Sequence, residues 1–123
     1  MTHFEFVFPF PPSLNRAYRA VSGRVLLSKA ARQYAVAVRN ALPAGRVERL
    51  TGRLRVVIGL VPPHRFGNRA WDVANREKVL CDALTKAGFW RDDSQIDSLQ
   101  LVRFGPRDHW PDGAAVVQVD VIS

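Results

Sequence analysis

The sequence has little cysteine, no long apolar run and few acidic side chains. Its single cysteine, Cys81, excludes an internal disulfide framework and fits a reducing compartment. No apolar run approaches the roughly 20 residues that a membrane-spanning helix needs. Residues 1–10 lack the basic segment and apolar stretch of a signal peptide. We therefore expect a cytoplasmic protein without a membrane partner.

The residues that are present favour one packed domain. A length of 123 residues is typical of a single domain, and a hydrophobic content of 47% is enough to build a core and argues against disorder. We expect one domain that spans residues 1–123.

Positive charge is concentrated in the first part of the chain. The formal net charge is +7, and fifteen of the eighteen basic residues are arginines. Residues 1–71 carry a net charge of +10, whereas residues 72–123 carry a net charge of −3. Arginine matches the geometry of phosphate, so the expected partner is a polyanion such as nucleic acid. An arginine-rich composition with solvated charges is the alternative that charge alone leaves open.

Alternating apolar residues and turn residues predict the strands. Residues 4–10 (FEFVFPF) place four phenylalanines on one buried face, and PPSLN (11–15) then forms a turn. Residues 17–28 are expected to form a hairpin around Ser22 and Gly23. Further strands are predicted at 53–63, 98–105 and 114–122.

Two main helices are expected between these strands. Ser28 is the predicted N-cap of a helix through Leu42, and residues 72–87 form a second helix closed by Gly88. With strands that are neighbours in sequence forming pairs, this order predicts an α+β fold with a mixed, largely antiparallel sheet.

Six of the eleven acidic residues lie between residues 72 and 97 of this basic chain. Asp72 stands at the start of the second helix, where the helix dipole and free N–H groups can hold a carboxylate. Asp92 and Asp93 follow in the loop after that helix. Carboxylates at a helix start and in a following loop can bind Mg²⁺, which prefers oxygen ligands and serves phosphodiester hydrolysis. The structural alternative is that Asp72 caps the helix and the other two residues form a turn.

Five stretches of the chain resemble one family. They are FPFPPSLNRAYR (8–19), SGR (22–24), VPPHR (61–65), DVANREK (72–78) and, as the longest and most specific, DALTKAGFWRDDSQI (82–96). Together they resemble the RusA-type Holliday junction resolvases, small dimeric endonucleases often carried by prophages. The resemblance implies a bacterial or prophage-encoded homodimer that cleaves four-way DNA junctions by paired symmetric nicks. It also implies Mg²⁺ as the cofactor, with Mn²⁺ as a substitute.

The family's active-site motif is D-x-D-N-x-x-K, followed by a D-D pair. Asp72 matches its first Asp, Asn75 its Asn and Lys78 its Lys, while Asp93 matches the catalytic Asp of the pair. The resemblance implies that Asp72 and Asp93 bind the metal and that Lys78 orients the attacking water or stabilises phosphate charge. The second Asp of the motif falls on Ala74, and there the sequence departs from the family pattern.

The expected DNA contacts lie in the basic part of the chain and beside the motif. Phe66 stands between basic residues in the loop before Asp72 and is a candidate wedge at the centre of a junction. Trp71 and Trp90 are expected to pack in the core rather than to stack on bases. The expected DNA-binding residues are Asn15, Arg16, Arg65, Phe66, Arg69, Asn75 and Arg76.

Ala74 has no side-chain oxygen and cannot bind a cation. Three accounts of it remain: an engineered change, which the intact pattern around it favours; a natural loss of cleavage; or a site that works with Asp72, Asp93 and a recruited Asp92. We expect this chain to bind junctions and to be catalytically impaired. The alternative function is a non-cleaving junction-binding or nucleic-acid-binding protein, which gives no reason for the motif residues.

Overall fold

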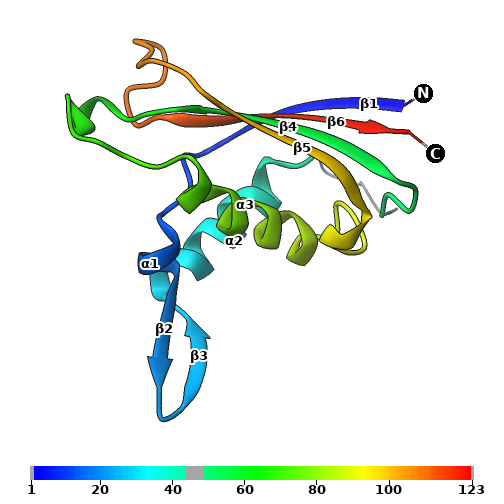
Figure 1. The fold of residues 1–123 in the computed structure, drawn as a ribbon, viewed down its shortest axis with the longest axis horizontal. Coiled ribbons are helices and arrows are strands. Elements are labelled where there is room, and N and C mark those ends of the chain that lie inside the picture. The colour runs from blue at the N-terminus through cyan, green and yellow to red at the C-terminus, as the bar shows by residue number, and fades with distance from the viewer. Residues whose placement is uncertain (1, 44–48, 123) are drawn as a thin grey trace.

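The main sheet has four strands in the order β1-β6-β4-β5 (Figure 1). The computed structural model describes residues 2–43 and 49–122. Strand β6 runs antiparallel to both of its neighbours, and β4 and β5 are parallel. The predicted mixed, largely antiparallel sheet is therefore confirmed. Its strands are β1 (Thr2–Phe8), β4 (Leu54–Val61), β5 (Ile96–Arg103) and β6 (Ala114–Val121).

The parallel pair follows from the connection between its strands. β4 leads into the helix α3 (Ala74–Lys86), which carries the chain back along the sheet before β5 begins, as a parallel crossover requires. Because β4 lies between β5 and β6, the prediction that sequence neighbours pair is wrong for those two strands. They are joined instead by residues 104–113, which pass the end of β4: the His64 N–H donates to the Pro111 carbonyl at 2.9 Å.

Two helices of 13 residues each cover one face of this sheet (Figure 1). α2 (Lys29–Ala41) begins after the predicted N-cap, since Ser28 Oγ accepts the Ala31 N–H at 3.1 Å. α3 ends before Gly88, whose φ of 79° is the left-handed conformation expected after a helix. Both predicted helices are confirmed, although α3 begins two residues later than expected. Within the described ranges, no helix is long and apolar enough to cross a membrane.

A group of aromatic side chains forms one part of the largely aliphatic core between these layers. Phe8 is buried, and Phe4 and Phe6 pack edge-to-face on Phe89 at centroid distances of 5.6 and 5.3 Å. Trp90 is fully buried, as expected, and its indole N–H donates to Thr85 Oγ1 at 2.6 Å. The predicted buried face of the first strand is thus confirmed up to Phe8, where the strand ends.

The hairpin of β2 (Tyr18–Val21) and β3 (Arg24–Leu27) projects from the body as a separate two-stranded sheet (Figure 1). Its turn has positive φ at both Ser22 (50°) and Gly23 (76°), the geometry that tight hairpins prefer. The hairpin prediction is confirmed, but the hairpin does not join the main sheet. The stretch predicted as a turn contains the start of a short helix, α1 (Leu14–Ala17).

Candidate nucleic-acid interface and active site

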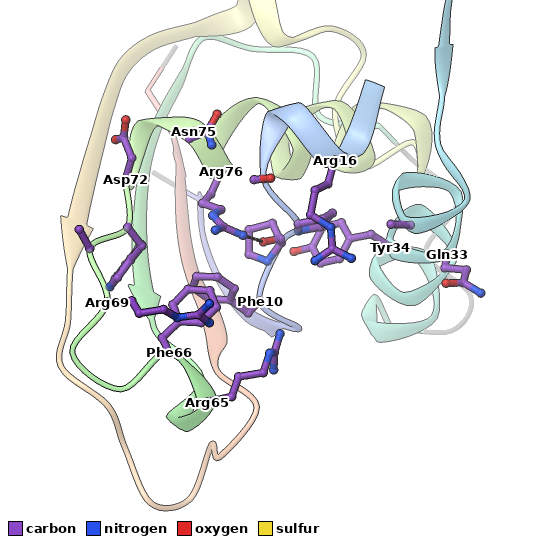
Figure 2. A pocket seen from close by; sticks show the side chains of 16 residues that line it. Phe10, Arg16, Gln33, Tyr34, Arg65, Phe66, Arg69, Asp72, Asn75 and Arg76 are labelled. Atoms are coloured by element: carbon purple, nitrogen blue, oxygen red, sulfur yellow. Dashed lines mark hydrogen bonds between the residues drawn. The ribbon is translucent and has the colours of Figure 1, made fainter. Parts of the chain in front are cut away.

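A pocket of about 790 Å³ opens beyond the carboxyl end of β4, where segments distant in sequence meet (Figure 2). One segment follows β1 and includes α1, a second runs from β4 to α3 and begins with the 3-10 helix η1 (His64–Phe66), and a third is the first turn of α3. α2 closes the pocket on another side with Tyr34. The Tyr34 hydroxyl donates to the Pro9 carbonyl at 2.7 Å and fixes the segment after β1 against α2.

Three partly buried aromatic rings form one wall of the pocket. Phe10 meets Phe66 at a centroid distance of 5.6 Å and an interplanar angle of 89°, and it meets Trp71 at 5.6 Å and 74°. Phe66 and Trp71 are 6.3 Å apart. Ring quadrupoles favour such edge-to-face contacts. Trp71 therefore packs against other side chains, as expected, but it also lines the pocket.

Arginine side chains lie over these rings. The Arg76 guanidinium is 5.1 Å from the centroid of Phe10 and 5.5 Å from that of Phe66. Arg65 and Arg69 lie 5.7 and 5.3 Å from the centroid of Phe66. Figure 2 shows these side chains gathered around the two phenylalanines. At such distances the positive charges are attracted to the ring faces, so the cluster holds together despite its repelling charges.

Arg76 is the most constrained of these cations. It is half-buried, and its Nη1 donates to the Pro11 carbonyl at 3.0 Å. Its Nε is buried and has no hydrogen-bond partner among the described residues. Burial lowers the pKa of Arg76 from its ordinary value, and the neighbouring charges of Arg16 and Arg65 lower that pKa further. An incoming anion or acceptor would relieve both the repulsion and the unpaired donor.

The first motif residues lie at the rim of this pocket. Asp72 is exposed, and its Oδ1 accepts the Ala74 N–H at 3.0 Å. The first N–H groups of a helix have no helical acceptor, so this bond satisfies one of them and holds the carboxylate at the start of α3. Asn75 is half-buried and lines the same pocket. Ala74 is exposed, so an aspartate at this position would not displace the core.

Lys78 faces a different group of residues, one turn further along α3. Its Nζ lies 3.2 Å from Asp82 Oδ2 and 6.0 Å from the ring centroid of Tyr18. The Tyr18 hydroxyl donates a hydrogen bond to the same carboxylate. Burial and the Asp82 carboxylate raise the pKa of Tyr18, so the phenol keeps its proton and remains a donor. Asp82 therefore holds both the base of the hairpin and the motif lysine.

The loop between α3 and β5 presents the second acidic part of the motif. Asp92 caps the 3-10 helix η2 (Asp93–Gln95) and accepts hydrogen bonds from the hydroxyl and the backbone N–H of Ser94. These two bonds hold the pKa of Asp92 below its ordinary value. Asp92 thus stabilises the turn, which is the structural alternative to metal binding given above, whereas the Asp93 side chain is exposed.

Gln95 fixes this loop from the inside. Its side chain is buried, and its amide makes four hydrogen bonds of 2.8 to 2.9 Å. The amide oxygen accepts two backbone N–H groups of the loop, and the amide nitrogen donates to two carbonyls of the segment before β4. The four partners are Arg91, Asp92, Leu50 and Gly52. The position of Asp93 is therefore set by a fully satisfied polar contact.

Asp72 and Asp93 lie toward opposite ends of β5. Arg103, the last residue of that strand, donates from Nη1 to the Trp71 carbonyl at 3.0 Å. Asp93 precedes Ile96, the first residue of the strand, and eight strand residues extend roughly 25 Å. In residues 2–43 and 49–122, no group of three or more His, Cys, Asp or Glu side chains could hold a metal. Within one chain, Asp72 and Asp93 are therefore too far apart to hold one Mg²⁺ ion together.

The structure brings seven of the predicted site residues to the pocket and leaves four outside its lining: Asn15, Ala74, Lys78 and Asp93. Asn15 is exposed on α1 and does not line the pocket, while Lys78 and Asp93 occupy the two places just described. The roles predicted for all of these residues stay predictions. Those that line the pocket are Arg16, Arg65, Phe66, Arg69, Asp72, Asn75 and Arg76.

Phe10, Trp71 and Tyr34 also line the pocket and were not predicted to. Alternation assigned Phe10 to the buried face of the first strand, and Tyr34 lies on the buried side of α2. The signal that could have placed Phe10 is the proline on each side of it, because a strand rarely continues through two prolines.

Arginines and aromatic rings around a pocket, with a carboxylate and an amide at its rim, are typical of a site that handles nucleic acid. A family model described as "Endodeoxyribonuclease RusA" matches residues 9–121. The chain is 34% identical over 110 residues to the crossover junction endodeoxyribonuclease RusA of Escherichia coli (strain K12) and to that of Shigella sonnei, with 84% of each chain covered. It is 34% identical over 105 residues to the enzyme of the same name from Enterobacteria phage HK97, again with 84% coverage. This chain belongs to the RusA family.

Proposed function

We propose that this protein binds four-way DNA junctions and acts in the class of endonucleases that resolve them by paired symmetric nicks. The observation that carries the proposal is the pocket in which Asp72 and Asn75 stand beside four arginines, in a chain whose relatives are named crossover junction endodeoxyribonucleases. Arginines position a phosphate backbone without reading its sequence. The protein, whether bacterial or prophage-encoded, would act on this substrate in the bacterial cytoplasm.

Paired cuts in two equivalent strands need two equivalent sites, which a two-fold homodimer supplies. In one chain, Asp72 and Asp93 lie toward opposite ends of β5, so a single copy does not bring them together. We therefore propose that Asp93 of one copy acts beside Asp72 of the other. The dimer is then required for cleavage as well as for symmetry.

A divalent cation, Mg²⁺ or Mn²⁺, would generate the attacking hydroxide and neutralise the charge that builds up on the phosphate. The proposed protein ligands are Asp72 and Asp93, one from each copy. Mg²⁺ usually takes only one or two carboxylates and keeps several waters, so this donor set is chemically suitable. Lys78, held by Asp82 on the exposed side of α3, would orient the attacking water or stabilise phosphate charge.

Ala74 weakens this proposed site because it removes a carboxylate from the start of α3. We expect the chain as it stands to bind junctions and to cut them poorly or not at all. An engineered replacement accounts best for the alanine, because the residues on both sides keep the family motif.

The experiment that tests the function compares this chain with Ala74→Asp on four-way junctions in Mg²⁺ and in Mn²⁺. We expect the aspartate to raise the rate of symmetric nicking by at least about a hundredfold, since even indirect partners of a metal are worth tenfold to a hundredfold. Ala74→Asn is the matched control, because it has the same size and one oxygen but no charge.

The outcomes separate the two candidate functions. Nicking by Ala74→Asp but not by Ala74→Asn supports the endonuclease. An Ala74→Asp protein that binds junctions and stays inert in both metals overturns it and leaves the non-cleaving junction-binding protein as the function.

A further inference from the structure

We propose that the pocket receives one unstacked nucleotide of the bound DNA, with its base against the aromatic wall of Phe10, Phe66 and Trp71. Its phosphate would lie toward Arg16 and Arg65 at the mouth. The proposal rests on the proposed function, because it takes a DNA junction as the ligand, and it adds a binding site for a single base.

The size and character of the pocket suit this ligand. Its volume of about 790 Å³ lies within the range of pockets that enclose small organic molecules. A double helix cannot enter such a space, whereas one nucleotide turned out of the stack can. At the crossover of a four-way junction, stacking is interrupted, so unstacking a base there requires less energy than in continuous duplex.

The aromatic wall is accessible to a base. Phe10, Phe66 and Trp71 are only partly buried, and all three line the cavity. Phe10 meets Phe66 and Trp71 edge-to-face, and Phe66 and Trp71 are tilted by 59°, so no two of these rings are stacked face-to-face. The group over Trp71 is the Arg103 guanidinium, at 4.5 Å from the ring centroid. The groups over Phe10 and Phe66 are guanidinium planes, which themselves stack on bases. A base can therefore lie against rings, against an arginine, or between the two.

Arg76 has a hydrogen-bond donor that is unpaired within the described part of the free protein. Its Nε is buried without an acceptor among the described residues, while Nη1 is already bonded to the Pro11 carbonyl. A buried donor without a partner is rare in proteins and unfavourable. Bases carry carbonyl and ring-nitrogen acceptors at their edges, so a base in the pocket could accept this hydrogen bond.

This arrangement differs from a wedge formed by Phe66. A wedge must protrude so that its ring can enter the base stack. Phe66 is half-buried and packs against both Phe10 and Trp71, so its ring belongs to the wall of a cavity. A wedge depends on Phe66 alone, whereas a receiving pocket depends equally on Phe10 and Arg76.

The test measures the coupling between a protein change and a DNA change. Junctions are made with an abasic nucleotide at each position flanking the crossover in turn, and their dissociation constants are measured in EDTA so that no strand is cut. The protein variants are Phe10→Leu and Arg76→Lys, the second of which keeps the charge but loses the Nε donor. Phe104→Leu is the matched control: Phe104 is another partly buried ring with an arginine, Arg107, over it at 5.7 Å, and it lies outside the pocket.

At one junction position we expect the missing base to weaken binding by this chain about tenfold or more, the usual effect of losing a stacked base. The same abasic change should have little effect on Phe10→Leu and a reduced effect on Arg76→Lys, while Phe104→Leu should behave like the parent. The fluorescence intensity of 2-aminopurine placed at that position should change when the parent binds. The change should be much smaller when Phe10→Leu binds. Because the cycle compares two DNAs on each protein, a general loss of stability cancels.

Two failures can be told apart. If the chain binds junctions no better than linear duplex, the proposed function fails. If it binds junctions tightly but no abasic position couples to Phe10 or Arg76, the pocket proposal fails alone. Coupling to Phe66→Ala without coupling to Phe10→Leu identifies the wedge instead and likewise overturns the receiving pocket.

Discussion

At the scale of a single residue, Gly113 lies close to Phe10, one of the aromatic residues that line the pocket. Its φ is +82°, a conformation that side-chain-bearing residues rarely adopt. A Cβ at this position would lie 2.7 Å from the Val61 carbonyl oxygen and 3.0 Å from Phe10 Cβ. Glycine is thus needed for two separate reasons, and the second reason ties the loop before β6 to the aromatic wall.

We expect Gly113→Ala to destabilise the protein by about 3 kcal/mol, from backbone strain and from the clash with backbone atoms together. This corresponds to a fall in melting temperature of roughly 10 °C. Gly23→Ala is the matched control, because Gly23 has a similar φ of +76° and a Cβ there would meet nothing within 4 Å. It should lose only about 1 kcal/mol. Equal melting temperatures for the two variants would show that Gly113 does not lie against Val61, Pro63 and Phe10 as described.

Some single residues could be placed in the fold from the sequence, and others could not. Asp72 could be assigned to the start of α3 because a carboxylate before an apolar helical pattern is a local signal, and its bond to the Ala74 N–H bears this out. Arg76 and Phe10 gave no such signal. They are 66 residues apart in sequence, and only the folded chain brings the guanidinium to 5.1 Å from the ring.

At the scale of elements, local pattern predicted the parts better than their arrangement. The Ser28 cap, the Ser22-Gly23 turn and the glycine after α3 are short-range features, and all three are found. The neighbours of β4 are a long-range property. β5 and β6 are each compatible with an adjacent antiparallel partner, and nothing within either strand shows that β4 will lie between them.

The η2 loop is an element whose order depends on one buried amide. We expect Gln95→Glu to destabilise the protein by about 3 kcal/mol, because a carboxylate would replace the donor that faces the Leu50 and Gly52 carbonyls. Thermal unfolding of the purified variant measures this loss. Gln100→Glu introduces the same change at an exposed position of β5 and should stay within about 0.5 kcal/mol of the parent.

The loss of these hydrogen bonds in Gln95→Glu should also disturb the position of Asp93, because Asp93 begins the same short helix. If the loop only supports the fold, then junction cleavage by an Ala74→Asp, Gln95→Glu protein should match that of Ala74→Asp well below the melting temperature. If the loop positions a metal ligand, cleavage should fall while junction binding is retained. The second result is the one that the proposed function requires.

At the scale of the whole molecule, the separation of Asp72 from Asp93 is the reason for proposing a site shared between two copies. The sequence predicts a metal-binding role for both residues, yet β5 runs between their locations. In a single chain, Asp72 and Asp93 are too far apart to act on the same phosphate. A two-fold dimer in which each copy supplies one residue to each site resolves this, and it makes a prediction that a single-chain site does not.

The prediction concerns mixed dimers built on the Ala74→Asp background. One chain carries Asp72→Asn and the other carries Asp93→Asn, and differently tagged chains are co-expressed so that the mixed dimer can be isolated. If each site uses both copies, the mixed dimer has one site with both changes and one site with neither. We expect it to nick one strand of a four-way junction, while either variant by itself is inert.

A site contained within one chain predicts the opposite, because each site of the mixed dimer would then carry one change. An isolated mixed dimer that binds junctions without nicking them would therefore refute the shared site while leaving the endonuclease assignment to the Ala74→Asp experiment. Single nicks instead of paired nicks are the informative product. They show that the intact site is alone in its dimer, which follows only if its two carboxylates come from different chains.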